Sequence, residues 1–387
     1  MRALVLNTSD KSITVQDVPK PKPGPKEILV RVRAVALNHV DYMNALKPLA
    51  AQEKRVLGSD FAGEVAEAGS DLVDLHDPRV KIGERVSGFL QGANSVNDRP
   101  GAFSEYLVVD YDLCWNIPRS VSFEEAATVS LAGMTAAQAV FSRLHLPSPF
   151  SGTKGFNDLD LAENEPVNVF IYGASSSVGL YAAQLVRLSE KTSSKKINLI
   201  GAASPPQHAL LYKAPYSYDT LVDYRDSAWP GMVRKAAGGV GVHYAIDAIS
   251  KGSTVEQTDS VIQDGGKLAI FRAPAAGGFD ITKLKRKPIF GAVWEALGVD
   301  VVYHGGVVIP STTDSREFAA AFFNFLSSGA ASNEAKLQPN PVRVLPGGLD
   351  KISSEGFGLL SGSPQPDQGQ TREVLKPVSG EKIVYLI

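Results

Sequence analysis

The residues with the clearest chemical potential lie in a turn of small side chains, Gly173–Gly179, directly after the apolar run Val167–Ile171. The run predicts a buried strand, and the glycines predict a tight turn from this strand into a helix. Backbone N–H groups at the start of a helix bind anions, and three serines add hydroxyl donors. The same pattern also fits a tight strand–helix turn that binds no ligand. The residues predicted to hold a pyrophosphate are Gly173, Ser175, Ser176, Ser177, Val178 and Gly179.

The choice of dinucleotide depends on the residues after the next predicted strand, Ile197–Ala202. A site for NADH places a carboxylate there, which accepts a hydrogen bond from the ribose 2′-hydroxyl. In this chain the strand is followed by Ala203 and Ser204, and the next acidic residue is Asp219. Because no carboxylate would repel a 2′-phosphate, and Ser204 and Gln207 offer polar contacts, the sequence predicts NADPH as the cofactor.

The composition is that of an ordinary globular protein, and 387 residues predict about two domains. The net charge of −2 gives no reason to expect nucleic acid, and no basic cluster indicates a membrane surface. Cys114 is the only cysteine, which excludes an intramolecular disulfide and a cysteine-rich zinc site. No signal peptide or membrane-spanning run is apparent, so we expect a cytoplasmic protein.

Two kinds of pattern divide the chain. Roughly the first 125 residues contain closely spaced strand-like segments with glycine turns, such as Glu27–Ala36, which predict a small β-barrel. From Val167 onward, strands alternate with helices such as Leu180–Lys191, which predicts a doubly wound parallel sheet. A helix over Phe318–Leu326 and a last strand over Glu381–Ile387 complete the predicted α/β fold.

The order of these motifs resembles that of the medium-chain dehydrogenase/reductase superfamily along nearly the whole chain. The residues that carry the resemblance are Asn38–Asp41, Gly58–Val65, Gly83–Val86, Gly101–Val108, Gly173–Gly179 and Ser379–Lys382. The resemblance implies a GroES-like β-barrel domain beside a Rossmann domain, with the active site in the cleft between them. We expect residues 1–136 and 308–387 to form the barrel domain and residues 137–307 to form the Rossmann domain.

Zinc-dependent members of this superfamily carry a cysteine at the position of Asn38 and a histidine at the position of Ser59. They also carry four lobe cysteines that this chain lacks. A catalytic zinc ion needs three firm protein ligands, and His39 and Asp60 do not supply them. We therefore expect no metal and interpret His39 as a polar residue of the cleft or core. Without a Lewis acid, hydride transfer to a polarised double bond is favoured over alcohol oxidation.

Within the zinc-free branch, the chain is most similar to the trans-acting enoyl reductases of fungal polyketide biosynthesis. The similarity lies in Tyr172–Val178, Ala202–Gln207, Val222–Arg225, Tyr244–Asp247, the long Pro147–Pro166 loop and the ending Val378–Val384. It implies a small or carrier-tethered polyketide-like substrate, a polyketide synthase as partner and a monomeric enzyme. Met43 departs from the pattern, because these reductases commonly carry a lysine at that position.

The resemblance also implies roles for individual residues. The implied cofactor contacts are Asn38, Val40, Asp41, Thr135, Tyr224, Phe271, Arg272, Val378 and Ser379, of which Asn38–Asp41 are expected to end a barrel strand. Thr135 and Tyr42 are the candidate catalytic residues, with Tyr42 as a hydrogen-bond donor in place of the absent lysine. The plainer alternatives are that Tyr42 is a packed aromatic, Thr135 bonds its own helix and Asp41 holds a loop.

The leading hypothesis is an NADPH-dependent reductase of an activated carbon–carbon double bond in secondary-metabolite biosynthesis, in which the cofactor carries the hydride chemistry. One alternative is a free-standing oxidoreductase of quinones or alkenals. Another, kept open by Met43, is an NADPH-binding scaffold with a cyclase-like or partner role. The resemblance places the substrate-lining loops at residues 41–57, 88–100 and 279–310. We interpret the basic run Leu284–Pro288 as a solvated loop, with a docking patch for an acidic carrier protein as the alternative.

Overall fold

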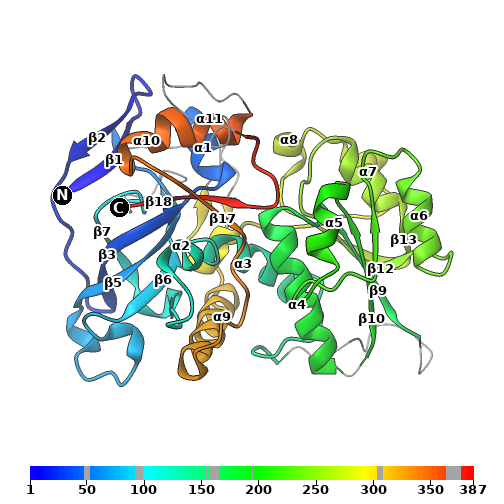
Figure 1. Cartoon of the computed structure of the whole chain (residues 1–387), viewed down its shortest axis with the longest axis horizontal. Coiled ribbons are helices and arrows are strands. Elements are labelled where there is room, and N and C mark those ends of the chain that lie inside the picture. The colour runs from blue at the N-terminus through cyan, green and yellow to red at the C-terminus, as the bar shows by residue number, and fades with distance from the viewer. Residues whose placement is uncertain are drawn as a thin grey trace. The chain divides into compact units, whose positions relative to one another are not determined.

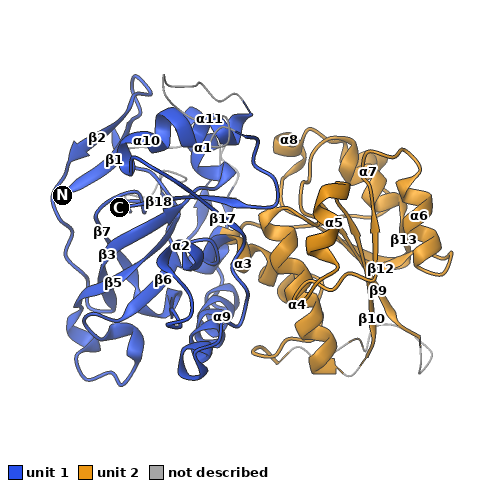
Figure 2. Ribbon diagram, viewed as in Figure 1, with its two compact units in different colours: residues 1–131, 294–387 blue, residues 132–293 orange. Residues whose placement is uncertain are grey.

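The computed structural model describes residues 1–47, 53–92, 99–152, 156, 165–193, 195–302, 308–362 and 376–387. The chain divides into two compact units, residues 1–131 with 294–387 and residues 132–293 (Figure 2). The predicted boundaries lie later in the sequence, after residues 136 and 307. The segment that starts at Trp294 belongs to the first unit, because the Trp294 ring packs 5.9 Å from that of Phe89. Most of the Pro147–Pro166 loop lies outside the described residues.

The first unit is built from short strands, as predicted. They are β1 (Arg2–Asn7), β2 (Ile13–Asp17), β3 (Glu27–Ala36), β4 (Lys54–Val56), β5 (Asp60–Ala68), β6 (Arg85–Phe89), β7 (Tyr106–Asp110), β8 (Cys114–Asn116), β15 (Val301–Val302), β16 (Val308–Ile309), β17 (Val342–Leu345) and β18 (Lys382–Leu386). A seven-stranded sheet runs β17-β18-β3-β5-β6-β8, with β7 also paired to β3, and a three-stranded sheet runs β2-β1-β4. Register shifts interrupt the pairing of β3 with β5 beside Val30 and Ala34, and such bulges bend a strand.

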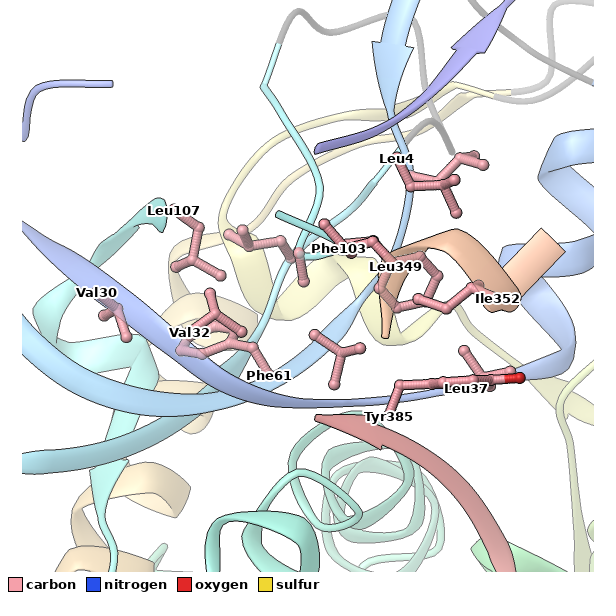
Figure 3. Close-up of a cluster of buried hydrophobic side chains, with 14 of the residues drawn as sticks. Leu4, Val30, Val32, Leu37, Phe61, Phe103, Leu107, Leu349, Ile352 and Tyr385 are labelled. Atoms are coloured by element: carbon pink, nitrogen blue, oxygen red, sulfur yellow. The ribbon is translucent and has the colours of Figure 1, made fainter. Parts of the chain in front are cut away.

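The C-terminal strand β18 lies inside the larger sheet, parallel to β17 and antiparallel to β3. Both ends of the chain therefore share one core, in which Leu4, Phe61 and Tyr385 are at most 1% exposed (Figure 3). Burying one such side chain stabilises a fold by about 1.5–3 kcal/mol. This core fixes the starts of β5 and β18, where the polar residues Asp60 and Lys382 lie.

A helix follows β3 where the sequence predicts the end of a barrel strand. The prediction for Asn38–Asp41 is wrong, because β3 stops at Ala36 and helix α1 (His39–Leu46) begins two residues after Leu37. The N–H of Asn38 donates to Oδ2 of Asp41 at 2.8 Å, a bond of the capping-box type that favours the start of a helix. The other α-helices described in this unit are α2 (Phe123–Ala126), α9 (Thr313–Ser332), α10 (Leu349–Lys351) and α11 (Phe357–Ser361), and α3 (Ser130–Ala137) begins here.

The second unit confirms the predicted alternation of strands and helices (Figure 1). Its strands are β9 (Val167–Tyr172), β10 (Ile197–Ala202), β11 (Thr220–Val222), β12 (Val242–Asp247), β13 (Ile262–Ile270) and β14 (Ile289–Phe290). Its helices are α4 (Ser177–Ser193), α5 (Pro205–Leu211), α6 (Trp229–Ala236), α7 (Ser253–Ser260) and α8 (Pro274–Gly277). The sheet order is β11-β10-β9-β12-β13-β14, and every pairing is parallel. The carboxyl ends of the strands therefore share one edge, which is where such sheets bind ligands.

Among the described residues, no helix combines the length and the apolar character that crossing a membrane requires.

Candidate functional site

The turn between β9 and α4 requires glycine at both ends. Gly173 has a φ of 75°, and a Cβ there would lie 2.8 Å from Cγ1 of Ile249. A Cβ on Gly179 would lie 2.3 Å from the carbonyl oxygen of Gly173, which no side chain tolerates. The first turn of the helix consequently starts directly against the end of the strand, as the glycine pattern predicts.

The start of α4 suits an anion, and one of the predicted hydroxyls also caps the helix. Oγ of Ser176 accepts from the N–H of Gly179 at 3.1 Å, so Ser176 caps the helix. The N–H of Val178 lies in the first turn, where the helix itself offers no acceptor. Ser175, Ser177 and Val178 are half-buried. Together with the positive end of a 17-residue helix, these groups fit a phosphate.

The end of β10 presents no carboxylate to a neighbouring ribose. Ala203 is 1% exposed, and Ser204 is half-buried in the extended residue before α5, where its side chain makes no cap hydrogen bond. Gln207 is half-buried in α5. Asp219, the first acidic residue downstream, is engaged, because its Oδ2 accepts from the guanidinium of Arg187 at 2.7 Å. An NADH-specific turn carries a carboxylate at this place, which would repel a 2′-phosphate. The end of β10 carries none and therefore suits the 2′-phosphate of NADPH.

Tyr224 extends the same edge beyond β11. It is 43% exposed, and its ring meets that of Tyr172 edge-on with the centroids 6.2 Å apart. Arg225 lies over the Tyr224 ring and forms an ion pair with Asp223 at 3.0 Å. Since β9, β10 and β11 are neighbours in the sheet, the glycine turn, Ser204 and Tyr224 follow strand ends at one edge.

Sequence reasoning missed the group that shapes the next part of this edge. Asp247 ends β12 and is fully buried, and its carboxylate accepts from the N–H groups of Ile249 and Ser250 and from Oγ1 of Thr254. Burial raises the pKa of Asp247, and these three donors oppose the shift. Oγ of Ser250 accepts in turn from the N–H of Phe271 at 2.9 Å. The predicted cofactor contact at Phe271 is thus held by a turn whose only sequence signal is an acid at a strand end.

A second polar cluster lies in the first unit, beside α1. Asp41 is fully buried, and its carboxylate accepts from Oγ of Ser59 at 2.7 Å and from the N–H of Asn38 at 2.8 Å. Burial raises the pKa of Asp41 to about 7, against the opposing effect of these two hydrogen bonds. Near neutral pH the carboxyl group is therefore partly protonated. These contacts favour the alternative in which Asp41 holds local structure.

Asp60 connects this cluster to three other segments. Its Oδ2 accepts from Nδ2 of Asn38 at 3.0 Å and from Nζ of Lys382 at 2.5 Å, and its Oδ1 accepts from the N–H of Leu131 at 2.8 Å. Lys382 also donates to the carbonyl oxygen of Thr128 at 3.2 Å. The side chains of Lys382 and Asp60 are 4% and 0% exposed, so the ion pair is buried.

The residues at the positions of the zinc ligands do not fit a metal. Asn38 carries an amide that donates to Asp60, and Ser59 carries a hydroxyl that donates to Asp41. Among the described residues, no group of three His, Cys, Asp or Glu side chains is arranged to hold an ion. Cys114 is buried, and burial raises the pKa of its thiol.

The remaining predicted site residues lie in several settings. Tyr42 is half-buried in α1, and its ring lies 6.1 Å from that of Phe357, as expected for a packed aromatic. Met43 is 42% exposed, and Thr135 is 9% exposed in the part of α3 that belongs to the second unit. His39 is exposed and not in the core. The other predicted contacts are partly or fully exposed, namely Val40, Arg272, Val378 and Ser379.

A cavity of about 230 Å³ lies in the first unit and includes residues from two of the expected substrate-lining loops. Its walls are mostly apolar, and Leu90, Val109 and Leu113 are at most 2% exposed. Arg99 forms ion pairs with Glu27 and Asp110, so the charged groups at the polar side of the cavity are paired. The lining residues are Leu90, Gln91, Arg99, Val109, Asp110, Leu113, Leu297 and Val299.

Comparison with known proteins agrees with this architecture. Residues 24–119 match the alcohol dehydrogenase GroES-like domain. The crystal structure of an alcohol dehydrogenase superfamily protein from Novosphingobium aromaticivorans has a TM-score of 0.72 at 16% identity, covering 100% of this chain and 99% of that one. The crystal structure of CurK enoyl reductase has a TM-score of 0.69 at 16% identity, covering 100% and 98%.

The GroES-like unit, the parallel-sheet unit and the glycine turn define a medium-chain dehydrogenase/reductase. A trans-enoyl reductase of Alternaria alternata is 30% identical over 387 residues, which cover 100% of this chain and 98% of that protein. A trans-enoyl reductase of Pyricularia oryzae is 30% identical over 377 residues, covering 95% and 93%. The chain therefore belongs to the trans-enoyl reductase family within that superfamily.

Proposed function

We propose that the protein is an NADPH-dependent reductase of an activated carbon–carbon double bond, in an enoyl or enone group of a polyketide-like chain. Membership of the trans-enoyl reductase family along the whole chain supports this proposal most directly. When bound, NADPH supplies the hydride that adds to the β-carbon of the substrate. A polyketide synthase that presents the growing chain on a carrier is the proposed partner.

One edge of the parallel sheet supplies the proposed cofactor contacts. The N–H of Val178 and the hydroxyls of Ser175 and Ser177 suit the pyrophosphate at the start of α4. Ser204 and Tyr224 are the proposed neighbours of the 2′-phosphate. No carboxylate follows β10 directly, so nothing there opposes a second negative charge.

The chain must also stabilise the enolate oxygen and deliver a proton to the α-carbon. Tyr42 and Thr135 are the hydroxyl-bearing residues we propose for these steps. Tyr42→Phe and Thr135→Val should each lower kcat. The affinity for NADPH should stay within about twofold in Tyr42→Phe, whereas Thr135→Val should also weaken it, because Thr135 is an expected cofactor contact as well. A normal kcat in either variant would remove that residue from the mechanism.

The apolar cavity in the first unit is the proposed site for the distal part of the substrate chain. It exceeds the roughly 150 Å³ cavity that is sufficient to bind benzene. The Val109→Phe substitution would fill the cavity. It should raise KM for a long-chain enoyl thioester and leave KM for a short-chain enoyl thioester unchanged. An equal rise of KM for both substrates would show that the distal part of the substrate binds outside this cavity.

The proposed reaction is tested by mixing the protein with NADPH deuterated at C4 and an enoyl thioester. We expect NADPH consumption and a product with deuterium at its β-carbon, measured by mass spectrometry. Free enones and quinones, assayed in parallel, distinguish a free-standing oxidoreductase. Tight NADPH binding without consumption of any substrate would favour the non-redox scaffold and contradict the proposal.

A further inference from the structure

The buried ammonium of Lys382 is the group that the proposed mechanism leaves without a role. Lys382 is the first residue of β18, and its side chain is 4% exposed. Nζ donates to Oδ2 of Asp60 and to the carbonyl oxygen of Thr128. A buried lysine is rare unless it is paired, because removing a charge from water is costly.

Asp60 links Lys382 to two other segments of the chain. It is the first residue of β5, and it accepts hydrogen bonds from α1 through Asn38, from α3 through Leu131 and from β18 through Lys382. Both carboxylate oxygens are used. The Asn38 amide and the Leu131 N–H donate to different oxygens, so an asparagine at this position would place its NH2 group against one of these two donors.

The ammonium of Lys382 also compensates the charge of Asp60. A fully buried carboxylate without a nearby cation is strongly destabilised. Without the ammonium, Asp60 would have to move toward water or toward another donor, and its hydrogen bonds with Asn38 and Leu131 would be disturbed. The orientation of Asn38 at the start of α1 thus depends on the ammonium, although Lys382 and Asn38 are far apart in sequence.

We propose that Lys382 is a positioning residue, which holds Asn38 and the first turn of α1 through Asp60 and thereby sets the geometry of Asn38 and Val40, two residues for which the family resemblance implies a contact with NADPH. The proposal rests on the proposed function, because the position of these residues matters for binding only if the protein binds NADPH. Lys382 itself contacts neither substrate nor cofactor in the proposed role. Its effect passes through the buried carboxylate of Asp60.

The test compares Lys382→Met with the double variant Lys382→Met/Asp60→Asn and with Arg79→Met. Arg79 is a matched control, because its side chain is 7% exposed, pairs with Asp77 at 2.5 Å in the same unit and donates to the carbonyl oxygen of Cys114. Three quantities are measured in each variant: the Tm, the Kd for NADPH by fluorescence titration, and amide hydrogen exchange in a peptide covering residues 37–46.

We expect Lys382→Met to lower the Tm, to weaken NADPH binding at least tenfold and to speed exchange in the 37–46 peptide. The double variant removes the unpaired charge, so its Tm should recover while Kd and exchange remain altered. Arg79→Met should lower the Tm and leave Kd within twofold. Recovery of Kd together with Tm in the double variant, or a similar rise of Kd in Arg79→Met, would show that Lys382 acts only through stability and would overturn the proposal.

The failure of this inference can be distinguished from failure of the proposed function. The wild-type protein is assayed first for reduction of an enoyl thioester, and its Kd for NADPH is measured separately. If NADPH binds but no substrate is reduced, the reductase proposal fails while the Kd and exchange comparison still decides the role of Lys382. If reduction proceeds and the variants behave as the control does, the positioning role fails while the reductase proposal stands.

Discussion

Replacing Asp41 with asparagine should remove a specific pH dependence from the stability of the first unit. The carboxyl group is fully buried, and burial raises its pKa from 3.8 to about 7. Because the folded state binds this proton more tightly than the unfolded state does, Asp41 contributes stability that is fully present below about pH 4. That contribution is lost as the pH rises through 7. The Asp41→Asn variant keeps a neutral side chain of similar shape at every pH.

The size of the effect follows from the shift in pKa. About three pKa units, at 1.36 kcal/mol per unit, correspond to about 4 kcal/mol between pH 4 and pH 8. Other titrating groups are common to both proteins and cancel in the difference. The free energy of unfolding of the wild type, relative to that of Asp41→Asn, should therefore fall by about 4 kcal/mol over this range.

The free energy of unfolding is measured in urea at a series of pH values. Unfolding is monitored by hydrogen exchange in peptides from β3 and β5, so that the first unit is observed by itself. Asp10→Asn is the control, because Asp10 is exposed and its hydrogen bonds to Ser12 lower its pKa. Its contribution changes only below about pH 4, so its difference curve should be flat from pH 5 to pH 8. A flat curve for Asp41→Asn as well would refute a protonated Asp41 in the folded protein.

Three further outcomes are expected. Ser176→Glu should weaken NADPH binding at least tenfold, about 1.4 kcal/mol, because it places a negative charge at the start of α4. Ser176→Ala should cost about 1 kcal/mol of stability through the lost cap and should raise Kd less than Ser176→Glu does, because it removes a hydroxyl without adding a charge. Ser204→Asp should shift the ratio of NADPH to NADH affinity toward NADH in the same titration. Residue 204 is chosen over residue 203 because Ala203 is buried, so a carboxylate there could not reach a ribose. Elemental analysis should find no stoichiometric zinc, and one tightly held zinc ion per chain would contradict the interpretation of Asn38 and Ser59.

The sequence determined those features that depend on neighbouring residues. Alternating strand and helix patterns indicated the parallel sheet, and the glycines of the 173–179 turn indicated a strand that meets a helix start, because only glycine tolerates the observed backbone and the close contact. The absence of an acid directly after β10 is likewise visible in the sequence. Local reasoning failed at Asn38–Asp41, where a hydrogen bond between Asn38 and Asp41 starts a helix in place of a continued strand.

Tertiary structure alone decided which polar groups are buried and what they contact. The ion pair of Lys382 with Asp60, and the bond of Ser59 to Asp41, join residues from separate segments, so no local pattern specifies them. The same holds for the hydrogen bond from the N–H of Phe271 to Oγ of Ser250, which joins the turn after β12 to the residue after β13. The physical reason is that charge, hydrogen bonding and pKa depend on burial, and burial is fixed only when strands from both ends of the chain pack into one core.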